Sequence, residues 1–541
     1  MKTRTSLVAS AAAFGCIVLP THAATNATMN SQIRLALFGD SGMRVSWNTF
    51  QHVDTPTVHW GRSADNLNET ASSNVSVTYP TSLTYNNHVL IRGLKPDTTY
   101  FYLPAPLLND NDATPFNFTT LRPAGDTTPF SVAVVVDLGT MGSQGLTTHA
   151  GKKVASTNIL KVNETNTVQS LKEHIDEFDF LWHPGDIAYA DYWLKESIQG
   201  FLPNVTVADG VKTYESILND FYDEMMSVTA TKPYMVGPGN HEANCDNGGT
   251  TDLSKNITYT NSICMPGQTN FTGYKNHFRM PSALSGGTGN FWYSFDDGMT
   301  HFIQLDTETD LGHGFIAPDE VGGVEGMGAS SVNATLDAQS TWLEADLAAV
   351  NRSRTPWVVV AGHRPWYLSH ANTSGTICWS CKDVFEPLLL KYSVDLVLSG
   401  HAHVYERQAP LANGKVDPNE LNNPSSPWYI TNGAAGHYDG LDALQTPRQS
   451  YSRFGLDTTN ATYGWSRLTF HNCSYLTHDF ISSSNGSVLD SATLFKDRNC
   501  PSAAVNSTGS STAEINASAR SPLTGSRAAM VASLIALFGL L

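Results

Sequence analysis

Apolar and polar residues follow one spacing near the N-terminus and another spacing further along the chain. Between Ile33 and Leu121, short stretches alternate apolar and polar positions, as in Met43 to Trp47 and Thr57 to Trp60, and Gly, Pro, Asn and Asp separate them. Alternation with a period of two is typical of strands that bury one face. With breaks this frequent, the pattern predicts a small antiparallel β-sandwich over residues 32–122.

The segment from Leu94 to Tyr102, Leu-Lys-Pro-Asp-Thr-Thr-Tyr-Phe-Tyr, resembles the corner of a fibronectin type III-like module. The resemblance implies a fibronectin III-like fold for this sandwich. No catalytic constellation is evident in its sequence, and Pro123, Gly125 and Pro129 then mark a linker.

Beyond the linker, short and wholly apolar runs alternate with stretches of helical periodicity. This alternation predicts buried strands and crossover helices, and therefore an α/β domain over residues 128–498. Asp383, followed by Glu386, predicts the cap of one helix, and the aromatic segment from Trp428 to Phe480 predicts strands that complete the sheet. The apolar faces of three further helices are Val168, Leu171, Ile175 and Phe178; Tyr214, Ile217, Phe221 and Met225; and Leu336, Leu343 and Leu347.

Length and charge exclude several classes of protein. With 541 residues, 41% of them hydrophobic, the chain can bury more than one core, which excludes a low-complexity fibre and wholesale disorder. A net charge of -17 argues against a nucleic-acid or anionic-membrane partner, because both need a positive surface. Phosphate esters would also be repelled unless metal ions inverted the charge locally.

Both ends of the chain carry processing signals. Lys2 and Arg4 precede an apolar stretch and the small residues around Ala23, which predicts a signal peptide over residues 1–23. At the other end, a Ser/Thr-rich stalk over 501–527 precedes an apolar tail over 528–541 that is too short to span a bilayer. Small residues at Asn516-Ala517-Ser518 complete the pattern of a GPI-anchor signal, so we expect the protein on the cell surface or cell wall.

Cysteines and glycosylation motifs also favour an exported protein. Cys16 would leave with the signal peptide, and the other six cysteines can pair in fifteen ways. About sixteen N-x-S/T motifs predict a glycosylated surface. For Cys378-Trp379-Ser380-Cys381 we favour a structural bridge over a redox or zinc pair, because no second CxxC would complete a zinc site. Proximity favours Cys245 with Cys264, Cys378 with Cys381, and Cys473 with Cys500.

Five polar clusters each follow an apolar run. Because residues at the carboxyl ends of neighbouring strands converge on one crevice, we expect these clusters to meet. Their aspartates, tyrosine, asparagine and histidines combine hard oxygen donors with imidazoles, which suits iron or another first-row metal rather than calcium. The adjacent glycines allow the backbone to pass close to the ions. The clusters are Asp137-Leu138-Gly139, Gly185-Asp186-Ile187-Ala188-Tyr189, Gly239-Asn240-His241-Glu242, Gly362-His363 and Gly400-His401-Ala402-His403.

Each cluster alone has a simpler explanation. Asp137 and Asp186 sit in sequences that often form turns, and an isolated His363 would more often be a hydrogen-bonded core histidine. The ordered set of five is much more specific, and it resembles the five-block signature of the metallophosphoesterase superfamily. Tyr189 and the N-terminal sandwich narrow the resemblance to purple acid phosphatases of the fungal secreted or GPI-anchored type, over residues 33–495.

The resemblance implies an α/β domain with a two-sheet β-sandwich core flanked by helices, and a ligand for every position of a binuclear centre. By similarity, Asp137, Tyr189 and His403 would bind Fe(III), and Asp186 would bridge the two ions. The second ion, divalent zinc, iron or manganese, would be bound by Asn240, His363 and His401.

The resemblance also implies an acid phosphatase that hydrolyses phosphate monoesters with metal-activated hydroxide. His241 would contact the phosphoryl group or protonate the leaving group, unless it only supports Asn240. No adjacent histidine pair of the plant type follows His363, so His370 is the candidate second acid, although it could equally be an idle surface residue. Glu406 and Arg407 are expected to order His403.

Alternatives of two kinds stay open for the function, other phosphoesterases and a protein without activity. The same site would serve a phosphodiesterase, a nucleotidase or a phytase, and the loops over it, residues 322–328 and 371–382, would decide between them. A wall-anchored binding glycoprotein without activity ranks lower, because all seven ligand positions are filled. We expect small phosphorylated substrates as partners and a membrane contact only through the lipid anchor. The sequence specifies neither the oligomeric state nor the physiological substrate.

Overall fold

The computed structural model describes residues 30–105, 114–139, 165–199, 202, 205–243, 250–252, 255–260, 263–308, 338–370, 376–436, 440–457 and 462–498. The predicted signal peptide, stalk and apolar tail lie outside these residues, as do the loops 322–328 and 371–375. No helix in the described part of the chain is both long and apolar enough to cross a membrane.

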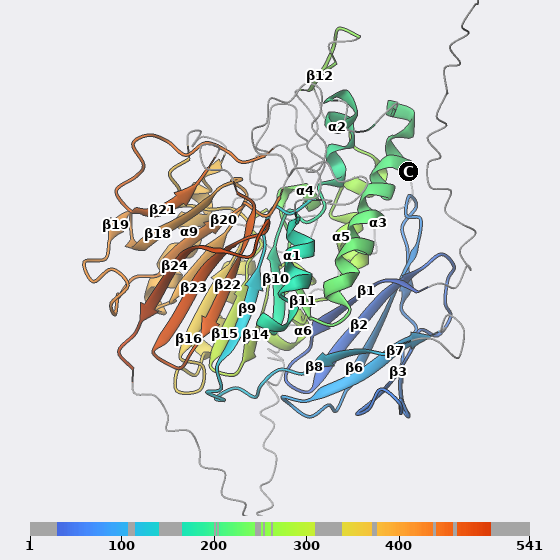
Figure 1. The fold of residues 1–541 in the computed structure, drawn as a ribbon, viewed down its shortest axis with the longest axis horizontal. Helices are drawn as coiled ribbons and strands as arrows, with labels where there is room; N and C mark the ends of the chain where they lie inside the picture. Colours follow the sequence, from blue (N-terminus) through green and yellow to red (C-terminus); the bar gives the residue numbers. More distant parts are fainter. Residues whose placement is uncertain are drawn as a thin grey trace, which may run out of the picture. The chain divides into compact units, whose positions relative to one another are not determined.

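The N-terminal module is a sandwich of two sheets, as the alternating pattern predicts (Figure 1). Met43, Val45 and Trp47 are fully buried, because alternate side chains of their strand point to the same face. The hydroxyl of Tyr100 accepts a hydrogen bond from the Lys95 amide at 2.9 Å, which closes the expected corner. One sheet contains β1 (Ser31–Leu37), β2 (Gly42–Thr49), β6 (Tyr85–Arg92) and β5 (Ser76–Val77), and the other contains β4 (Glu69–Ser72), β3 (Thr57–Gly61), β7 (Thr99–Ala105) and β8 (Phe116–Thr119).

Polar contacts join this sandwich to the α/β domain. The guanidinium of Arg34 on β1 donates to the His277 carbonyl at 2.9 Å, and the Tyr102 hydroxyl donates to the Ala230 carbonyl at 2.7 Å. Leu35 forms a parallel bridge with Pro233. Both sheets of the sandwich therefore contact the second domain.

The α/β domain is built on two large sheets. In the described residues, one sheet runs in the order β11 (Tyr234–Gly237), β10 (Phe180–Pro184), β9 (Phe130–Val134), β22 (Gly464–Phe470), β23 (Tyr475–Ser482) and β24 (Val488–Phe495). The other runs in the order β14 (Tyr293–Asp297), β15 (Thr300–Gln304), β16 (Trp357–Ala361), β17 (Leu396–Ser399), β20 (Trp428–Asn432), β18 (Tyr405–Ala412) and β19 (Lys415–Val416), and β21 (Ser452–Leu456) pairs with β18. A short hairpin of β12 (Thr250–Asp252) and β13 (Ile257–Tyr259) stands apart from them.

Aromatic side chains fill the space between the two sheets. Phe302 of β15 packs edge-on against Phe130, Phe180 and Phe470 of the other sheet, with ring centroids 6.4, 5.3 and 5.8 Å apart. These rings are almost fully buried, and such burial and edge-to-face packing make aromatic residues a large part of a core's stability. The expected two-sheet core flanked by helices is confirmed.

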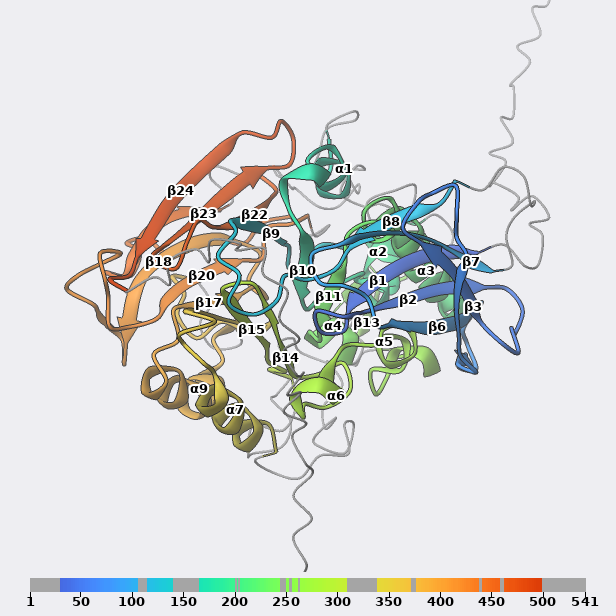
Figure 2. The ribbon, with the colours of Figure 1, turned by 90° about the horizontal axis from the view of Figure 1, so that it is seen from below.

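Helices cover the outer faces of the core (Figure 2), with α7 and α9 together on one side of the strands and α1 on the other. The helix predicted through Tyr214 and Met225 is confirmed as part of α3, and the one through Leu343 as α7, whereas Leu336 lies outside the described residues. The helices are α1 (Thr167–Glu173), α2 (Trp193–Gln199), α3 (Gly210–Thr229), α4 (Asn240–Ala243), α5 (Thr272–His277), α6 (Ser282–Ser285), α7 (Ala338–Ala349) and α9 (Trp379–Lys391).

Two helix predictions need correction. The first helix ends at Glu173, and a 3₁₀ turn over Ile175–Glu177 carries the chain on to Phe178. Helix α9 begins at Trp379, so Asp383 lies inside it and does not cap it. The cap is Cys378, whose sulfur accepts a hydrogen bond from the Cys381 amide.

The predicted Cys378–Cys381 bridge is present. Cys264 and Cys473 are also disulfide-bonded, while Cys245 and Cys500 lie outside the described residues. Their pairing therefore stays a prediction.

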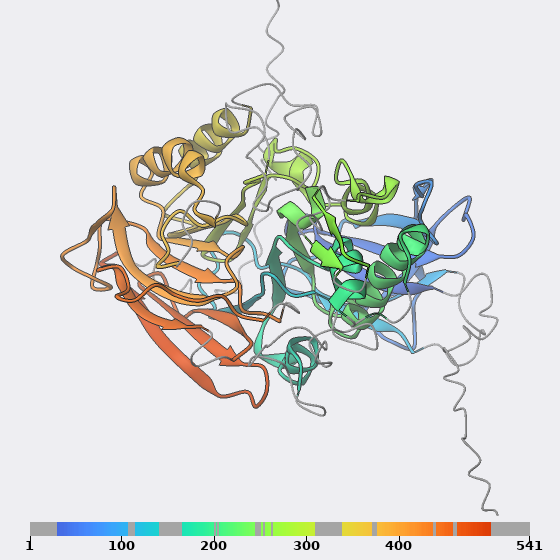
Figure 3. The same ribbon diagram turned by 90° about the horizontal axis from the view of Figure 1, so that it is seen from above.

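The parallel strands determine where the polar clusters lie. β9, β10 and β11 run parallel in one sheet, and β15, β16, β17 and β20 run parallel in the other. Asp137, Asp186 and Asn240 follow the first three strands, and His363 and His401 follow β16 and β17. Figure 3 views the molecule from the end at which these clusters meet.

Candidate metal centre

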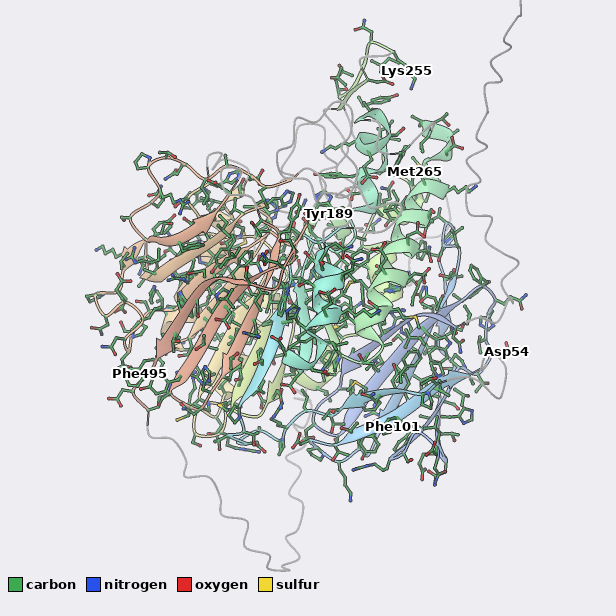
Figure 4. All side chains as sticks on the ribbon, viewed as in Figure 1. Asp54, Phe101, Tyr189, Lys255, Met265 and Phe495 are labelled. Carbon is green, nitrogen blue, oxygen red and sulfur yellow. A yellow bond between two sulfur atoms is a disulfide. The ribbon has the colours of Figure 1, made fainter. Side chains whose placement is uncertain are left out.

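The seven predicted ligand side chains come together at the carboxyl ends of the two parallel groups of strands. Figure 4 shows one of them, Tyr189, at the upper end of the strands. The side chains divide into two groups with Asp186 between them.

Asp137, Tyr189 and His403 form the first group. The Tyr189 hydroxyl lies 2.7 Å from Asp137 Oδ1, 3.1 Å from Asp186 Oδ2 and 3.0 Å from His403 Nε2. Asp137 and Tyr189 are almost completely buried. Two carboxylate oxygens and an imidazole nitrogen therefore surround one hydroxyl in a site nearly closed to solvent.

Asn240, His363 and His401 form the second group. Asn240 Oδ1 lies 3.0 Å from His363 Nε2 and 3.0 Å from His401 Nδ1, and the two ring nitrogens are 3.2 Å apart. His363 Nε2 is also 2.9 Å from Asp186 Oδ2. Asp186, His363 and His401 offer ligand atoms that all lie within 4.8 Å of one another.

The backbone is held in the left-handed region at four of the seven positions. Asp137, Asp186, Tyr189 and His401 have φ values of 60°, 51°, 51° and 67°. Residues other than glycine seldom adopt this region, and such backbone strain clusters at functional sites. The strand ends are thus bent so that these side chains point into one space.

Glycines next to the ligands allow the backbone to lie close to the ligand side chains. A Cβ on Gly239 would lie 2.2 Å from Asp186 Oδ1, and a Cβ on Gly400 would lie 2.4 Å from Asp137 Oδ2. Carbon atoms essentially never approach that closely, so both positions require glycine, as the sequence predicts.

The charge balance of the cluster fits bound cations. Burial, then the carboxylates of Asp137 and Asp186, raise the pKa of Tyr189 well above its usual value. Burial disfavours a charged His363, but Asp186 outweighs it and the pKa of that ring rises to about 9. Without metal ions, protons must therefore supply positive charge to these ligands. Metal ions would satisfy the same lone pairs, and mixed carboxylate, phenol, amide and imidazole donors suit first-row metals.

His241 lies beside this cluster and is held by Asp191. Its Nδ1 is 2.7 Å from Asp191 Oδ2, and its Nε2 is 3.9 Å from Asp186 Oδ2. The rings of Tyr189 and Tyr192 pack on it, with centroids 4.3 and 4.6 Å away. The imidazole thus has a fixed orientation beside the first group.

His370 lies at the edge of the site. Its Nε2 is 3.4 Å from Asp442 Oδ2, and the same carboxylate oxygen accepts a hydrogen bond from the His403 amide at 2.9 Å. The residue also forms an antiparallel bridge with Leu444. His370 is therefore connected to His403 through one carboxylate.

The expectation for Arg407 is wrong. Its guanidinium binds both oxygens of Asp490, at 2.7 and 2.9 Å, and Glu406 accepts hydrogen bonds from Ser369 and Gln408. The backbone of His403 is ordered by Asp442 instead.

Sequence reasoning also missed the role of Glu242. Its carboxylate accepts hydrogen bonds from the amides of Asp186, Ile187 and Gly239, at 2.8 to 2.9 Å. It belongs to the Gly-Asn-His-Glu cluster, so the spacing could have pointed to it. Asp442 carries no such signal, because it lies in a loop far along the chain from the motifs.

Family models match most of the chain. A model described as calcineurin-like phosphoesterase matches residues 133–405, and one described as purple acid phosphatase, N-terminal domain, matches residues 30–120. A third, iron/zinc purple acid phosphatase-like protein C, matches residues 426–491.

Individual proteins are similar over most of their length. Acid phosphatase A of Cryphonectria parasitica is 37% identical, over 86% of this chain and 91% of that protein. An acid phosphatase of Aspergillus ficuum is 33% identical, over 84% of this chain and 85% of that protein. The solved structure of a purple acid phosphatase from yellow lupin (Lupinus luteus) seeds has a similar fold, with a TM-score of 0.61 at 20% identity over 87% of this chain and 75% of that one.

The converging ligand set is thus accompanied by three consecutive family models and by relatives that match over most of their length. This chain therefore belongs to the purple acid phosphatases, within the calcineurin-like phosphoesterases.

Proposed function

We propose that this protein is an acid phosphatase that hydrolyses phosphate monoesters of small molecules at a binuclear metal centre. Family membership implies two metal ions, iron and one other. The observation that carries the proposal is the convergence of metal-binding atoms around Tyr189, whose hydroxyl lies within 3.1 Å of a carboxylate oxygen of Asp137, a carboxylate oxygen of Asp186 and His403 Nε2.

The two groups of ligands suggest how the ions are divided. Asp137, Tyr189 and His403 would hold Fe(III), since a phenolate and a carboxylate are hard anionic donors. Asn240, His363 and His401 would hold a divalent ion, zinc, iron or manganese. Asp186 would bridge the two, because its Oδ2 lies near both Tyr189 and His363.

When bound, the ions would polarise the phosphoryl oxygens and lower the pKa of a water molecule. The chain itself orients the groups around them. Asp191 fixes His241 through Nδ1, which leaves Nε2 on the side of Asp186 and the site. His241 can there donate to a phosphoryl oxygen or give a proton to the leaving alcohol.

For the second acid, the candidate is His370. Its side chain is mostly buried, and its Nε2 faces Asp442 at 3.4 Å. A histidine held by a carboxylate in this way is oriented to exchange a proton at the rim of the site.

The cellular location of the protein is part of the same proposal. The signal peptide over 1–23, the N-x-S/T motifs and the tail over 528–541 support a secreted glycoprotein held by a GPI anchor. Cells that express the full chain should release its activity when treated with a phospholipase that cleaves GPI anchors. Activity that stays on the cells, or is already free in the medium, would contradict the anchor.

The decisive experiment measures metal content, the visible spectrum and hydrolysis of a chromogenic phosphomonoester at acidic pH, for the wild type and for Tyr189→Phe. We expect two metal ions per chain, turnover, and a tyrosinate-to-iron absorption band that Tyr189→Phe abolishes. A colourless protein that binds two ions and turns over would keep the phosphatase and reject the iron–tyrosinate site. A wild type with neither metal nor turnover would overturn the proposal.

A further inference from the structure

One side of the N-terminal sandwich consists of two edge strands that follow each other in the chain. The sheet order places β4 at the edge of one sheet and β5 at the edge of the other. Among the described residues, β4 pairs only with β3, and β5 only with β6. The edge strand β1 differs, because its Leu35 forms a bridge with Pro233 of the second domain. Residues 69–77 therefore run along the edge of one sheet and then along the edge of the other.

The strand β4 has few of the features that normally protect an edge. An edge strand presents unpaired N–H and C=O groups, and proteins usually guard it with lysine, proline, a β-bulge or a covering segment. The sequence of β4, Glu-Thr-Ala-Ser, contains neither lysine nor proline, and its pairing with β3 shows no register shift. Three of its four residues are exposed. Apart from its short length, this edge has no protection of its own against pairing with another chain.

Glycosylation motifs flank this edge. Asn68-Glu69-Thr70 begins one residue before β4, and Asn74-Val75-Ser76 lies where the chain passes from β4 to β5. Both asparagines are exposed, and among the described residues their side-chain amides form no hydrogen bond. The other edge strand of the β4 sheet, β8, contains a third motif at the exposed Asn117. The motifs of this module thus lie in or beside its edge strands.

We propose that Asn68 and Asn74 carry N-linked glycans that prevent the edge formed by β4 and β5 from pairing with a second copy of the chain. The inference rests on the part of the proposed function that makes this protein a secreted glycoprotein. In the modification, the asparagine amide nitrogen displaces the diphosphate of a lipid-linked oligosaccharide. A C–N bond to the sugar forms, the C–O bond between sugar and diphosphate breaks, and the amide loses one proton.

The dimensions of the edge explain why two glycans suffice. A strand of four residues is about 13 Å long, and a strand that paired with it would lie about 4.8 Å away. An N-linked glycan is bulky and strongly hydrated. A second chain could therefore not lie along β4 without meeting the sugars at both of its ends.

The experiment compares glycan occupancy with self-association in the full chain purified from a eukaryotic host. Peptide mass spectrometry measures occupancy, and sedimentation velocity over a wide range of protein concentration measures association. The variants are the double substitution Asn68→Gln/Asn74→Gln and the control Asn351→Gln. Asn351 begins an exposed motif in the loop between α7 and β16, away from any strand edge.

We expect glycans on Asn68 and Asn74 in the wild type and stronger self-association in the double variant. The association constant should rise about tenfold or more, because a few added backbone hydrogen bonds exceed the free energy of one decade in affinity. Asn351→Gln should associate like the wild type. Phosphomonoester hydrolysis and the melting temperature should be the same in all three proteins, which shows that each is folded.

A lysine within the edge distinguishes strand pairing from a general loss of solubility. Thr70 is exposed and lies opposite His59 in β3, so a lysine there would project from the edge strand. A charged residue in an edge strand disfavours pairing. Adding Thr70→Lys to the double variant should therefore return the association constant to the wild-type value.

The inference is overturned if the double variant associates no more than the wild type, if Asn351→Gln associates as strongly, or if Thr70→Lys does not reverse the effect. If the double variant does not fold, an endoglycosidase can trim the folded wild type and folded Thr70→Lys. The trimmed wild type should then associate and trimmed Thr70→Lys should not. Unmodified Asn68 and Asn74 beside glycans elsewhere would overturn this inference alone, whereas no glycan on any motif would also refute the proposed glycoprotein.

Discussion

Two clusters of imidazole and carboxylate groups in this protein differ in how their side chains pair and in the conformation of their backbone. In one, His301 lies between Asp296 and Asp346, with Nδ1 2.6 Å and Nε2 2.8 Å from their oxygens. Ser294 donates its hydroxyl to the other oxygen of Asp346 at 2.7 Å. Each ring nitrogen here has its own oxygen acceptor.

The metal centre lacks this one-to-one pairing. The Tyr189 hydroxyl lies within 3.1 Å of two carboxylate oxygens and of His403 Nε2, and the backbone of Asp137, Asp186 and Tyr189 lies in the left-handed region. A cluster whose groups pair one to one stabilises the fold, whereas several ligand atoms gathered in one space on a strained backbone favour a bound ion. Residue types alone would place a metal ion in both, so the geometry of the side chains is the better guide.

The largest expected effect comes from removing the bridging carboxylate of the metal centre. Asp186→Asn keeps the shape of the side chain and removes a negative donor that lies between the two ligand groups. We expect loss of at least one metal ion and a fall in phosphomonoester hydrolysis of about a thousandfold or more, equivalent to about 4 kcal/mol of activation free energy. Metal analysis and steady-state kinetics test this, with circular dichroism to confirm folding.

His301→Gln provides the contrast to that variant. It should leave metal content and iron absorption at wild-type values. Wild-type metal content in Asp186→Asn, or lost metal in His301→Gln, would show that the two clusters do not differ in metal binding.

The second prediction concerns stability and pH in the His301 cluster. Burial disfavours the charged ring, but Asp296 and Asp346 outweigh it and raise the pKa of His301 from 6.5 to about 9. Because the folded pKa is raised, the stabilisation is fully present below about pH 6.5 and is lost as the pH rises through 9. His301→Gln should therefore lower the free energy of unfolding by up to about 3 kcal/mol in acid, and by little above pH 9.

Urea unfolding at pH 5.5, 7.5 and 9.5 measures this effect. The exposed His471, whose Nε2 lies 2.9 Å from Thr477 Oγ1, gives the control His471→Gln, which should show no such trend. A loss of stability in His301→Gln that is the same at all three pH values would mean that the ring is held by shape and not by charge.

Much of the fold was predictable from sequence because the spacing of apolar residues indicates which side chains are buried. Alternation predicted the sandwich strands, and apolar runs predicted β9, β10 and β17. The start of α9 was not predictable in this way, because its cap is the sulfur of Cys378, which the disulfide places there. The early end of α1 was missed since a 3₁₀ turn can continue the same apolar spacing as far as Phe178.

The site was predictable only where ligands follow strands. Asp137, Asp186 and His363 carry that signal, and the structure brings them together. Asp442 reaches the His403 amide from a distant loop, and the contact of Arg364 with His401 depends on the packing of two strand ends. Such contacts depend on tertiary structure, and one sequence holds no periodic pattern that marks them.

The smallest expected effect tests whether hydrogen-bond balance matters within the His301 cluster itself. Ser294→Ala removes the donor to Asp346 Oδ1 and leaves that buried oxygen without its hydroxyl partner. We expect a loss of about 1 kcal/mol in the free energy of unfolding, the typical cost of one buried hydrogen bond. The control is Ser491→Ala, because Ser491 donates to Asp479 at the same distance of 2.7 Å but is exposed, and water can replace it. A Ser294→Ala variant as stable as Ser491→Ala would show that the cluster tolerates an unpaired acceptor. One-to-one pairing would then no longer distinguish the His301 cluster from the metal centre, and the strained backbone at Asp137 and Asp186 would have to carry that distinction.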